Sequence, residues 1–183
     1  MTNLFSLAEQ IRKCTACPLW KKRTLTVPGE GPENADILFV GEAPGVEEDR
    51  KGLPFVGKSG TFLDEMIQII GITKKDVFIT NCVKCRPPNN RKPTGKELET
   101  CTKLWLEKQI VSIKPKVIVI LGRVALQSVL KKTNIHELHG KVITKNKQKY
   151  FITYHPVAGM RFPATFQKIK SDCIKLVNDI NIL

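Results

Sequence analysis

Short apolar runs recur along the chain, and each has the length of a β-strand. They occupy residues 36–40, 77–80, 117–121 and 150–153, and a Gly, Asn or His follows closely after each of them. Polar and apolar residues hardly alternate within these runs, which is typical of strands that are buried on both faces. The pattern therefore predicts a largely parallel sheet that is covered by helices on both sides.

The segments between these runs have helical periodicity. Apolar residues recur at helical spacing over 62–70, 124–130 and 166–180. Thr94 and Glu97 form a capping-box pattern, which predicts that another helix begins there and carries Cys101 and Trp105 on one side. Because strands alternate with helices, the chain is expected to have an α/β fold, in which ligands bind at the carboxyl ends of the strands.

Composition and charge narrow the class of protein. The chain has 183 residues, 42% hydrophobic and 26% charged, which predicts a single domain over 1–183 with a sizeable core. We find no signal peptide and no membrane span in the sequence, so we expect a soluble, intracellular protein. The net charge of +13 favours a polyanionic partner, most simply nucleic acid, although a solvated basic surface is the alternative.

Polar groups follow the predicted strands at one edge of the sheet. Glu42 comes after the first run, within the turn 41–45, Asn81 comes after the second, and His155 comes after the fourth. Each is weak alone, because a turn carboxylate is usually solvated, an Asn after a strand usually caps, and a single His is more often structural. Their predicted convergence on one rim makes this rim the candidate site.

The cysteines indicate a bound metal, because nothing in the chain points to secretion. Cys14 and Cys17 form one C-x-x-C pair, and Cys82 and Cys85 form another. These four could hold zinc with tetrahedral geometry. Cys101 lies further along, so the spacing alone leaves the ligand set open.

A phosphate-binding loop is a rival interpretation of residues 52–59. The string Gly52-Leu53-Pro54-Phe55-Val56-Gly57-Lys58-Ser59 matches G-x-x-x-x-G-K-[ST]. Its context argues against a nucleotide hydrolase, because charged residues rather than an apolar strand precede it and its central residues are bulky. No apolar strand ends in the Asp that magnesium would need.

Five stretches occur in an ordered series from Cys14 to about Pro163. They are Cys14-x-x-Cys17-Pro18, Gly41-Glu42-Ala43-Pro44-Gly45 with Glu47-Glu48-Asp49, Gly52-Leu53-Pro54-Phe55-Val56-Gly57, Asn81-Cys82-Val83-Lys84-Cys85-Arg86-Pro87-Pro88, and Tyr154-His155-Pro156 with Arg161-Phe162-Pro163. In these stretches the sequence resembles family 4 uracil-DNA glycosylases, the iron-sulfur members of their superfamily. The resemblance implies a three-layer α/β/α sandwich with a central four-stranded, mainly parallel sheet. It also implies DNA repair by hydrolysis of the N-glycosidic bond of uracil in single- and double-stranded DNA, which leaves an abasic site.

The resemblance also implies a cofactor and a ligand set. In this family a [4Fe-4S] cluster is held at the positions of Cys14, Cys17, Cys85 and Cys101, which leaves Cys82 and Cys173 as small buried residues. Zinc remains the alternative on coordination chemistry alone. The ligands would join a segment of about residues 10–25 to the rest of the domain, so the simplest role of the cluster is structural.

The glycosylase hypothesis gives the rim residues roles. Phe55 would stack on the extruded base, Asn81 would pair with uracil N3–H and O4, and His155 would donate to O2 as negative charge develops there. Some relatives place an Asp where this chain has Ala43, so Glu42 or backbone carbonyls must orient the water. Glu42 could instead exclude thymine. The remaining candidates for contact with the substrate are Gly41, Ala43, Glu48 and Asn90.

Basic and loop residues would contact the DNA. We expect Lys84, Arg86, Arg91 and Lys92 to grip phosphates, while the lysines of 141–149 fit a solvated hairpin. The segment Val157, Ala158, Gly159, Met160 and Arg161 would enter the minor groove, although it lacks the Ser of the His-Pro-Ser found in many relatives.

The expected partner is DNA that contains uracil. We expect a monomer located in the cytoplasm with the nucleoid and with no membrane partner, and the sequence does not support a sliding-clamp partner. Two other classes stay open, a non-catalytic metal-containing DNA-binding protein and, less favoured, the nucleotide hydrolase.

Overall fold

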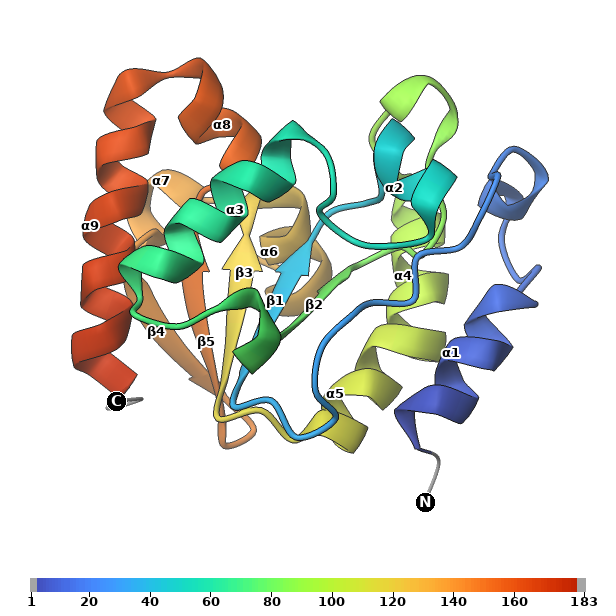
Figure 1. The fold of residues 1–183 in the computed structure, drawn as a ribbon, viewed down its shortest axis with the longest axis horizontal. Helices are drawn as coiled ribbons and strands as arrows, with labels where there is room; N and C mark the ends of the chain where they lie inside the picture. The colour runs from blue at the N-terminus through green and yellow to red at the C-terminus, as the bar shows by residue number, and fades with distance from the viewer. Residues whose placement is uncertain (1–2, 181–183) are drawn as a thin grey trace.

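The computed structural model describes residues 3–180, and a five-stranded sheet with the strand order β2-β1-β3-β5-β4 forms its centre (Figure 1). The strands are β1 Ile37–Gly41, β2 Val77–Asn81, β3 Val117–Leu121, β4 Lys141–Lys145 and β5 Gln148–Thr153. Neighbouring strands are parallel except β4, which runs antiparallel to β5. The four apolar runs are the parallel strands, so the predicted fold class is confirmed. The edge strand β4, which is the first strand of the hairpin expected over 141–149, adds a fifth strand to the four that we predicted for the sheet.

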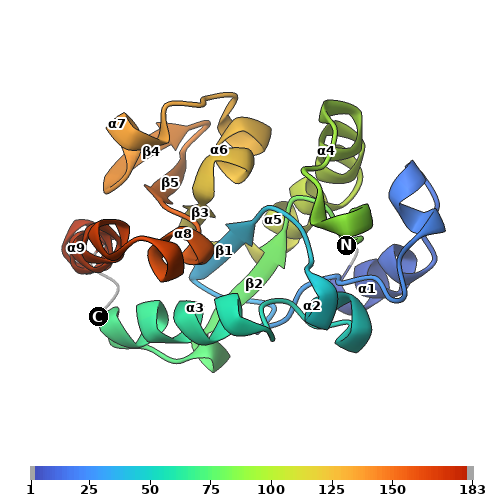
Figure 2. The same cartoon turned by 90° about the horizontal axis from the view of Figure 1, so that it is seen from above.

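The helices form layers on both faces of the sheet. They are α1 Leu4–Arg12, α2 Val46–Lys51, α3 Lys58–Ile69, α4 Gly95–Cys101, α5 Glu107–Ile113, α6 Gly122–Leu130, α7 Ile135–Leu138, α8 Pro156–Arg161 and α9 Pro163–Ile180. Short 3₁₀ turns occur at η1 Pro18–Lys21, η2 Lys74–Asp76 and η3 Pro88–Asn90. Seen from above, α3 and α9 lie on one face and α6 with the α4–α5 helix on the other (Figure 2).

The core extends from the sheet into the N-terminal helix. Every residue of β1, β2 and β3 is buried, as expected for strands between two helical layers. The α1 residues Leu7 and Ile11 belong to the same hydrophobic cluster, and so does Leu19 of η1. No helix within residues 3–180 is long and apolar enough to span a bilayer.

The helix predicted at Thr94 is confirmed, and it contains an unexpected π-helical turn. The capping box closes through Glu97 N to Thr94 Oγ1 at 3.3 Å and Thr94 N to Glu97 Oε2 at 2.7 Å. Between α4 and α5 the chain forms the π-helical turn η4, Thr102–Leu106. Such turns are rare and often occur at functional sites. Cys101 precedes this turn and Trp105 lies within it, and both line one pocket.

The two edges of the sheet differ. Glu30 bridges to Ile79 of β2, so an extended segment covers that edge. Gly31 has φ +135, and a Cβ there would lie 2.2 Å from the Val77 carbonyl oxygen, so only glycine allows this approach. The opposite edge is β4, which joins β5 through a tight turn at Asn146 and Lys147 with positive φ at both residues. The predicted solvated hairpin is therefore confirmed.

Residues 52–59 do not form a phosphate-binding loop. Gly52 has φ +72 and ends helix α2, while Gly57 is the N-cap of helix α3. The segment therefore connects two helices, whereas a phosphate-binding loop leaves a buried strand directly. The nucleotide-hydrolase alternative is wrong for this segment.

Candidate functional site

The predicted rim exists at the carboxyl ends of the parallel strands. Glu42 follows β1, Asn81 ends β2 and His155 lies two residues after β5. Gly41 is paired with Asn81 in the parallel register, so the ends of β1 and β2 lie side by side. Beyond the strands the connection continues, because Cys82 N donates to the Gly41 carbonyl oxygen at 2.9 Å.

Asn81 has an unused acceptor inside the protein. Asn81 is 2% exposed, and its Oδ1 is buried without a hydrogen-bond partner among the described residues. A Cβ at Gly41 would lie 2.4 Å from this oxygen and 2.7 Å from Phe55 Cζ, so the absence of a side chain at Gly41 keeps the approach clear. Because an unpaired buried amide oxygen is costly, it points to a ligand that donates a hydrogen bond there.

Phe55 is held beside Asn81 in a strained backbone conformation. Its φ is +49, in the left-handed region that residues with a Cβ rarely adopt. Lys74 Nζ donates to its carbonyl oxygen at 3.0 Å, and a Cβ at Gly60 would lie 1.8 Å from that oxygen. Phe55 is 4% exposed, and the centroid of its ring lies 6.0 Å from that of the His155 ring. Strain of this kind persists where the surroundings fix it, commonly at functional sites.

His155 is a neutral imidazole with a defined tautomer. Burial lowers the pKa of His155 to about 4. Its Nδ1 accepts a hydrogen bond from Val157 N at 3.3 Å, at the N-terminus of helix α8. An accepting nitrogen carries no proton, so we assign the proton of the neutral ring to Nε2, which can donate to a ligand. The backbone and Cβ of His155 are packed against Gly122, whose φ is +87 and whose added Cβ would lie 2.8 Å from His155 Cβ.

The two candidate acids of the first loop have different surroundings. Glu42 is partly buried; burial raises the pKa of its carboxyl, and nearby Lys92 opposes this rise. Glu48 is buried, and its two oxygens accept from the backbone N–H groups of Gly45, Val56 and Gly57 at 2.9 to 3.0 Å. Glu48 therefore connects the first loop to the Phe55 segment through hydrogen bonds. Of these two acids, Glu42 is the one whose carboxylate oxygens are available to a ligand or water.

Two other predicted substrate contacts differ in exposure. Ala43 is partly buried and packs against the hydrophobic core. Asn90 is exposed, has φ +54, and accepts a hydrogen bond from Arg86 Nε at 2.8 Å. Among the described hydrogen bonds, Asn90 is therefore engaged with a predicted phosphate contact rather than with the rim.

The prediction that Lys84 grips phosphate is wrong. Lys84 is 1% exposed, and its Nζ is surrounded by protein acceptors. Of the other basic residues, Lys92 is exposed, whereas Arg91 forms a two-pronged ion pair with Glu97 at 2.8 and 2.9 Å. Arg91 therefore stabilises the start of helix α4 while its side chain is still 43% exposed.

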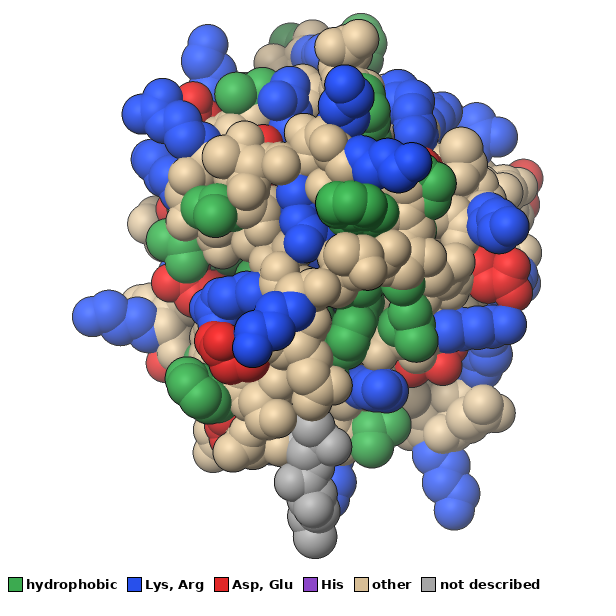
Figure 3. Space-filling model, turned by 90° about the vertical axis from the view of Figure 1, so that its right-hand side faces the viewer, with side chains coloured by type: hydrophobic (Ala, Val, Ile, Leu, Met, Phe, Trp, Pro, Cys, Tyr) green, Lys and Arg blue, Asp and Glu red, His purple; other side chains and the backbone are tan. Residues whose placement is uncertain are grey.

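Helix α8 presents only part of the predicted groove-entering segment. Met160 and Arg161 are exposed, and Val157 and Ala158 are partly buried. Gly159 is buried, and a Cβ there would lie 2.5 Å from Phe62 Cζ. Its role is therefore close packing and not outward contact. Lys and Arg side chains also predominate over the upper part of the face shown in Figure 3.

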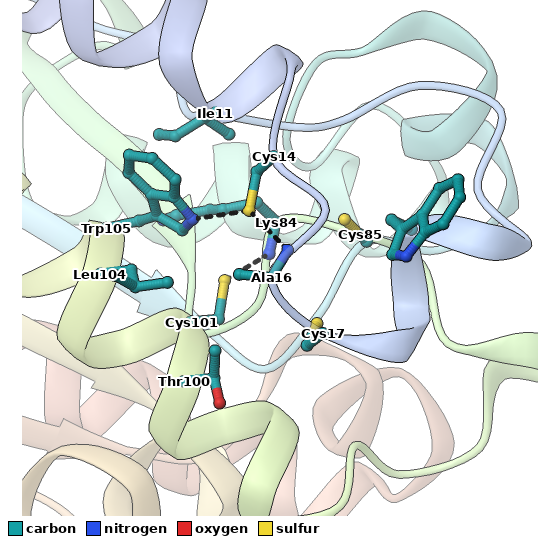
Figure 4. Close-up of a pocket in the computed structure, with 11 residues that line it drawn as sticks. Ile11, Cys14, Ala16, Cys17, Lys84, Cys85, Thr100, Cys101, Leu104 and Trp105 are labelled. Atoms are coloured by element: carbon teal, nitrogen blue, oxygen red, sulfur yellow. Dashed lines mark hydrogen bonds between the residues drawn. The ribbon is translucent and has the colours of Figure 1, made fainter.

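Four thiols from three segments of the chain line a second site, the thiol pocket. Cys14 and Cys17 come from the N-terminal segment, Cys85 from the loop after β2, and Cys101 from the end of α4. Figure 4 shows them around one space with Trp105 and Lys84 beside them. Cys82 is not among the lining residues; it is fully buried, and its thiol bonds Ser128. The pocket therefore contains the set with Cys101 rather than the set with Cys82.

Hydrogen-bond donors surround the sulfur atoms of the thiol pocket. Trp105 Nε1 donates to Cys14 Sγ at 3.3 Å, Arg23 Nη1 to Cys85 Sγ at 3.1 Å, and Lys84 N to Cys101 Sγ at 3.3 Å. Burial raises the pKa of the Cys85 thiol and raises that of Cys101 to about 12. Desolvated thiols with N–H donors aimed at them suit thiolates bound to a positive centre.

The four thiols share a pocket but are not arranged around a position for a single metal ion. Within residues 3–180, no three Cys, His, Asp or Glu side chains are placed to hold one metal ion. The fit of a cofactor therefore depends on the shared pocket and its donors, not on a preformed single-ion geometry.

Three residues that contribute to the rim or to the thiol pocket were not predicted from the sequence. Gly122 follows a buried strand just as Gly41 and Asn81 do, so the rule for strand ends could have identified it. Arg23 reaches the thiol pocket and Gln109 reaches the end of β2 only because of the tertiary fold. No local sequence pattern marks either residue.

Comparison with known proteins agrees with this geometry. The family model described as the uracil DNA glycosylase superfamily matches residues 28–179. The chain is 45% identical to a type-4 uracil-DNA glycosylase of Saccharolobus solfataricus, over 96% of this chain and 86% of that protein. It is 44% identical to one of Archaeoglobus fulgidus, over 96% and 92%, and 47% identical to one of Thermotoga maritima, over 82% and 79%.

Proposed function

This chain belongs to the uracil DNA glycosylase superfamily, and on that premise we propose how its own residues recognise and release the base. It is a uracil-DNA glycosylase, an enzyme of DNA repair that hydrolyses an N-glycosidic bond. The buried, unpaired Oδ1 of Asn81, beside Phe55 and opposite His155, is the observation that carries the assignment of the site.

Asn81 reads the base. Its Oδ1 accepts from uracil N3–H, and its amide nitrogen donates to O4. Cytosine has no N3–H and has an amino group where uracil has O4, so both contacts would fail and Oδ1 would stay unpaired. Phe55 supplies a stacking surface, worth about 1 to 3 kcal/mol, that offsets part of the cost of extruding the nucleotide.

His155 stabilises the leaving base. As the glycosidic bond breaks, negative charge develops on uracil O2, and an N–H donor aimed at it lowers the barrier. The pKa of about 4 keeps the imidazole neutral at physiological pH, and the bond from Val157 N to Nδ1 leaves Nε2–H as the donor. The proton stays on His155, because uracil leaves as an anion.

Glu42 orients the water that attacks the sugar carbon released by uracil, and its carboxylate accepts the proton that this water loses. It is partly buried on the same rim, and it is the acid there whose oxygens the neighbouring backbone does not occupy in the described residues. Ala43, where some relatives have an Asp, has no acceptor in its side chain, so this task falls to Glu42. Glu48 acts indirectly by fixing the Phe55 segment.

DNA binds across the basic face above the rim. We assign phosphate contacts to Arg86, Lys92 and Arg161, with Arg91 contributing from its ion pair. Met160 is the exposed apolar residue of α8 that can fill the gap left by the flipped nucleotide. We further propose that the enzyme acts as a monomer in the cytoplasm, on the DNA of the nucleoid.

A [4Fe-4S] cluster is the group that the thiol pocket fits best. Cys14, Cys17, Cys85 and Cys101 would hold it, and the N–H donors around their sulfurs suit its negative charge. When bound it supplies a cross-link between three chain segments rather than chemistry on uracil, since glycosidic hydrolysis needs no electron transfer.

The test is release of uracil by the purified protein. It should open a single-stranded oligonucleotide at uracil after alkali treatment, without ATP or added divalent metal, and leave the matched thymine oligonucleotide intact. Binding of the uracil strand without breakage would instead favour a non-catalytic DNA-binding protein. The Asn81→Ala variant should lose the activity while it retains affinity for DNA without uracil.

A further inference from the structure

Lys84 is a buried cation that the catalytic scheme above does not use. It is 1% exposed, and its Nζ donates to Thr80 Oγ1 at 2.6 Å, to the Asn81 carbonyl oxygen at 2.8 Å and to Gln109 Oε1 at 2.6 Å. An ammonium group has three N–H donors, so these bonds satisfy all of them. The side chain is therefore fixed in one place at the end of β2.

Two of the three acceptors, the side chains of Gln109 and Thr80, are themselves fixed. Gln109 Nε2 donates to the Pro28 carbonyl oxygen at 2.7 Å, and Thr80 Oγ1 donates to the same oxygen at 2.9 Å. The network thus joins α5, the segment that covers the β2 edge, and the end of β2. The member of this network at the catalytic rim is Asn81, whose carbonyl oxygen is held while its side-chain Oδ1 has no partner among the described residues.

The main chain of Lys84 belongs to the thiol pocket. Its N–H donates to Cys101 Sγ at 3.3 Å, and the next residue is Cys85. The residue also lines the pocket. One residue therefore touches a thiol of the pocket through its backbone and the residue that reads the base through its side chain.

The charge of Lys84 has no carboxylate partner among the described residues. The acceptors of Nζ are a hydroxyl, an amide and a carbonyl oxygen, all neutral, and a buried ammonium without a countercharge is strongly disfavoured. Cys101 Sγ accepts from the backbone N–H of Lys84 at 3.3 Å, and the thiols of Cys101, Cys82 and Cys85 would stabilise the ammonium if they became negative. A cofactor held by thiolates would supply the missing countercharge.

We propose that Lys84 is a positioning residue that sets the place of Asn81 and makes it depend on the thiol pocket. The inference rests on the proposed function, because it assigns Asn81 the recognition of uracil. With the pocket loaded, the negative thiolates hold the ammonium and thereby the end of β2. Without that charge, the buried cation is left uncompensated and the position of Asn81 is less well defined.

The test measures binding of free uracil, which reports on Asn81 without the glycosidic step. Lys84→Met keeps the length of the side chain and removes its charge and donors. We expect uracil to bind at least tenfold more weakly, with affinity for uracil-free DNA changed by less than twofold. The control is Lys103→Met, which removes an exposed lysine paired with Glu99 and should bind uracil like the wild type.

A cycle with iron removal tests the link to the thiol pocket. Stripping iron from the wild type should weaken uracil binding severalfold, whereas stripping it from Lys84→Met should add no further loss. If Lys84→Met does not fold, Thr80→Val decides the matter, because it removes one acceptor with little change of shape. There we expect about threefold weaker uracil binding, and an unchanged value would overturn the proposal.

Other outcomes separate this inference from the proposed function. A folded Lys84→Met that binds uracil like the wild type overturns the positioning role alone. Equal losses on iron removal in wild type and variant overturn the link to the pocket. A wild type that neither binds uracil nor releases it from an oligonucleotide overturns the proposed function itself.

Discussion

Replacing His155 with Ala separates its chemistry from its structural contribution. The substitution removes the Nε2–H donor that we propose stabilises uracil O2. A single preorganised donor of this kind is worth about 3 to 4 kcal/mol of transition-state stabilisation, which corresponds to about 10²- to 10³-fold in rate. We therefore expect the single-turnover rate of uracil release to fall by two to three orders of magnitude.

The cost to folding should be much smaller. His155 is the N-cap of α8, and the protein hydrogen bond that the variant loses is the one from Val157 N to Nδ1. Losing an N-cap costs about 1 kcal/mol. For a chain of this size, that lowers the thermal midpoint by about 2 to 4 °C.

The pH dependence of stability supplies a second signature. Burial lowers the pKa of His155 from 6.5 to about 4, so the unfolded chain binds the proton more readily. The wild type therefore loses stability as pH falls from 6.5 toward 4, by about 3 kcal/mol in total. His155→Ala lacks this loss. The variant should be slightly less stable at neutral pH and more stable than the wild type below about pH 5.5.

The assay combines quenched single-turnover kinetics on a uracil oligonucleotide with denaturant unfolding between pH 4 and pH 7. His136→Ala is the matched control, because it removes an exposed imidazole whose partner is the Tyr154 hydroxyl. A His155→Ala rate within threefold of the wild type would refute the donor role. A fall in midpoint above about 10 °C, in step with the loss of activity, would refute the separation of the two effects.

Three further outcomes follow from the site. Burial raises the pKa of Glu42, so the rate of uracil release should fall with decreasing pH at a midpoint above the ordinary value of 4.5. Glu42→Gln should release uracil more slowly, at a rate that does not change with pH in this range. If the variant keeps the pH dependence of the wild type, Glu42 has no part in the mechanism. Gly41→Ala should fold yet bind free uracil at least tenfold more weakly, because its Cβ would lie 2.4 Å from Asn81 Oδ1 and 2.7 Å from Phe55 Cζ. Calorimetry with free uracil measures this affinity, and an affinity equal to that of the wild type would contradict the expectation. Removing iron should lower the thermal midpoint and speed proteolytic cleavage within residues 14–25, and identical digestion patterns would argue against a cross-linking group.

Local patterns predicted the strands and the rim because both depend on short-range signals. The runs at 77–80 and 117–121 consist of residues buried on both faces, and the residues that follow them are placed by the direction of the strand. Parallel strands that share one sheet bring those ends together. Asn81 and His155 could therefore be expected near one another, whereas Phe55 was expected beside them only because the family resemblance gave it the stacking role. The structure brings all three together.

The errors arose where tertiary contacts override local chemistry. Lys84 has the residue type of a phosphate contact, but the end of β2 and α5 enclose it. Gly159 lies in a loop-like string and yet packs against Phe62. The strand β4 has two lysines and a threonine, too polar to stand out as an apolar run, and pairs with β5 through backbone bonds that composition does not reveal. The domain extent predicted for 1–183 includes residues 1–2 and 181–183, which lie outside the described part.

The open edge of the sheet has a consequence for solubility at high concentration. The edge strand β4 carries Lys141 and Lys145, and the turn and partner strand add Lys147 and Lys149. Two copies that approached edge to edge would bring these ammonium groups together, and this repulsion opposes the backbone pairing that starts fibril growth. Replacing the four lysines with threonine should leave the fold intact but make the protein aggregate in concentrated solution. The same charge that attracts a polyanion thus also keeps the copies of the enzyme apart.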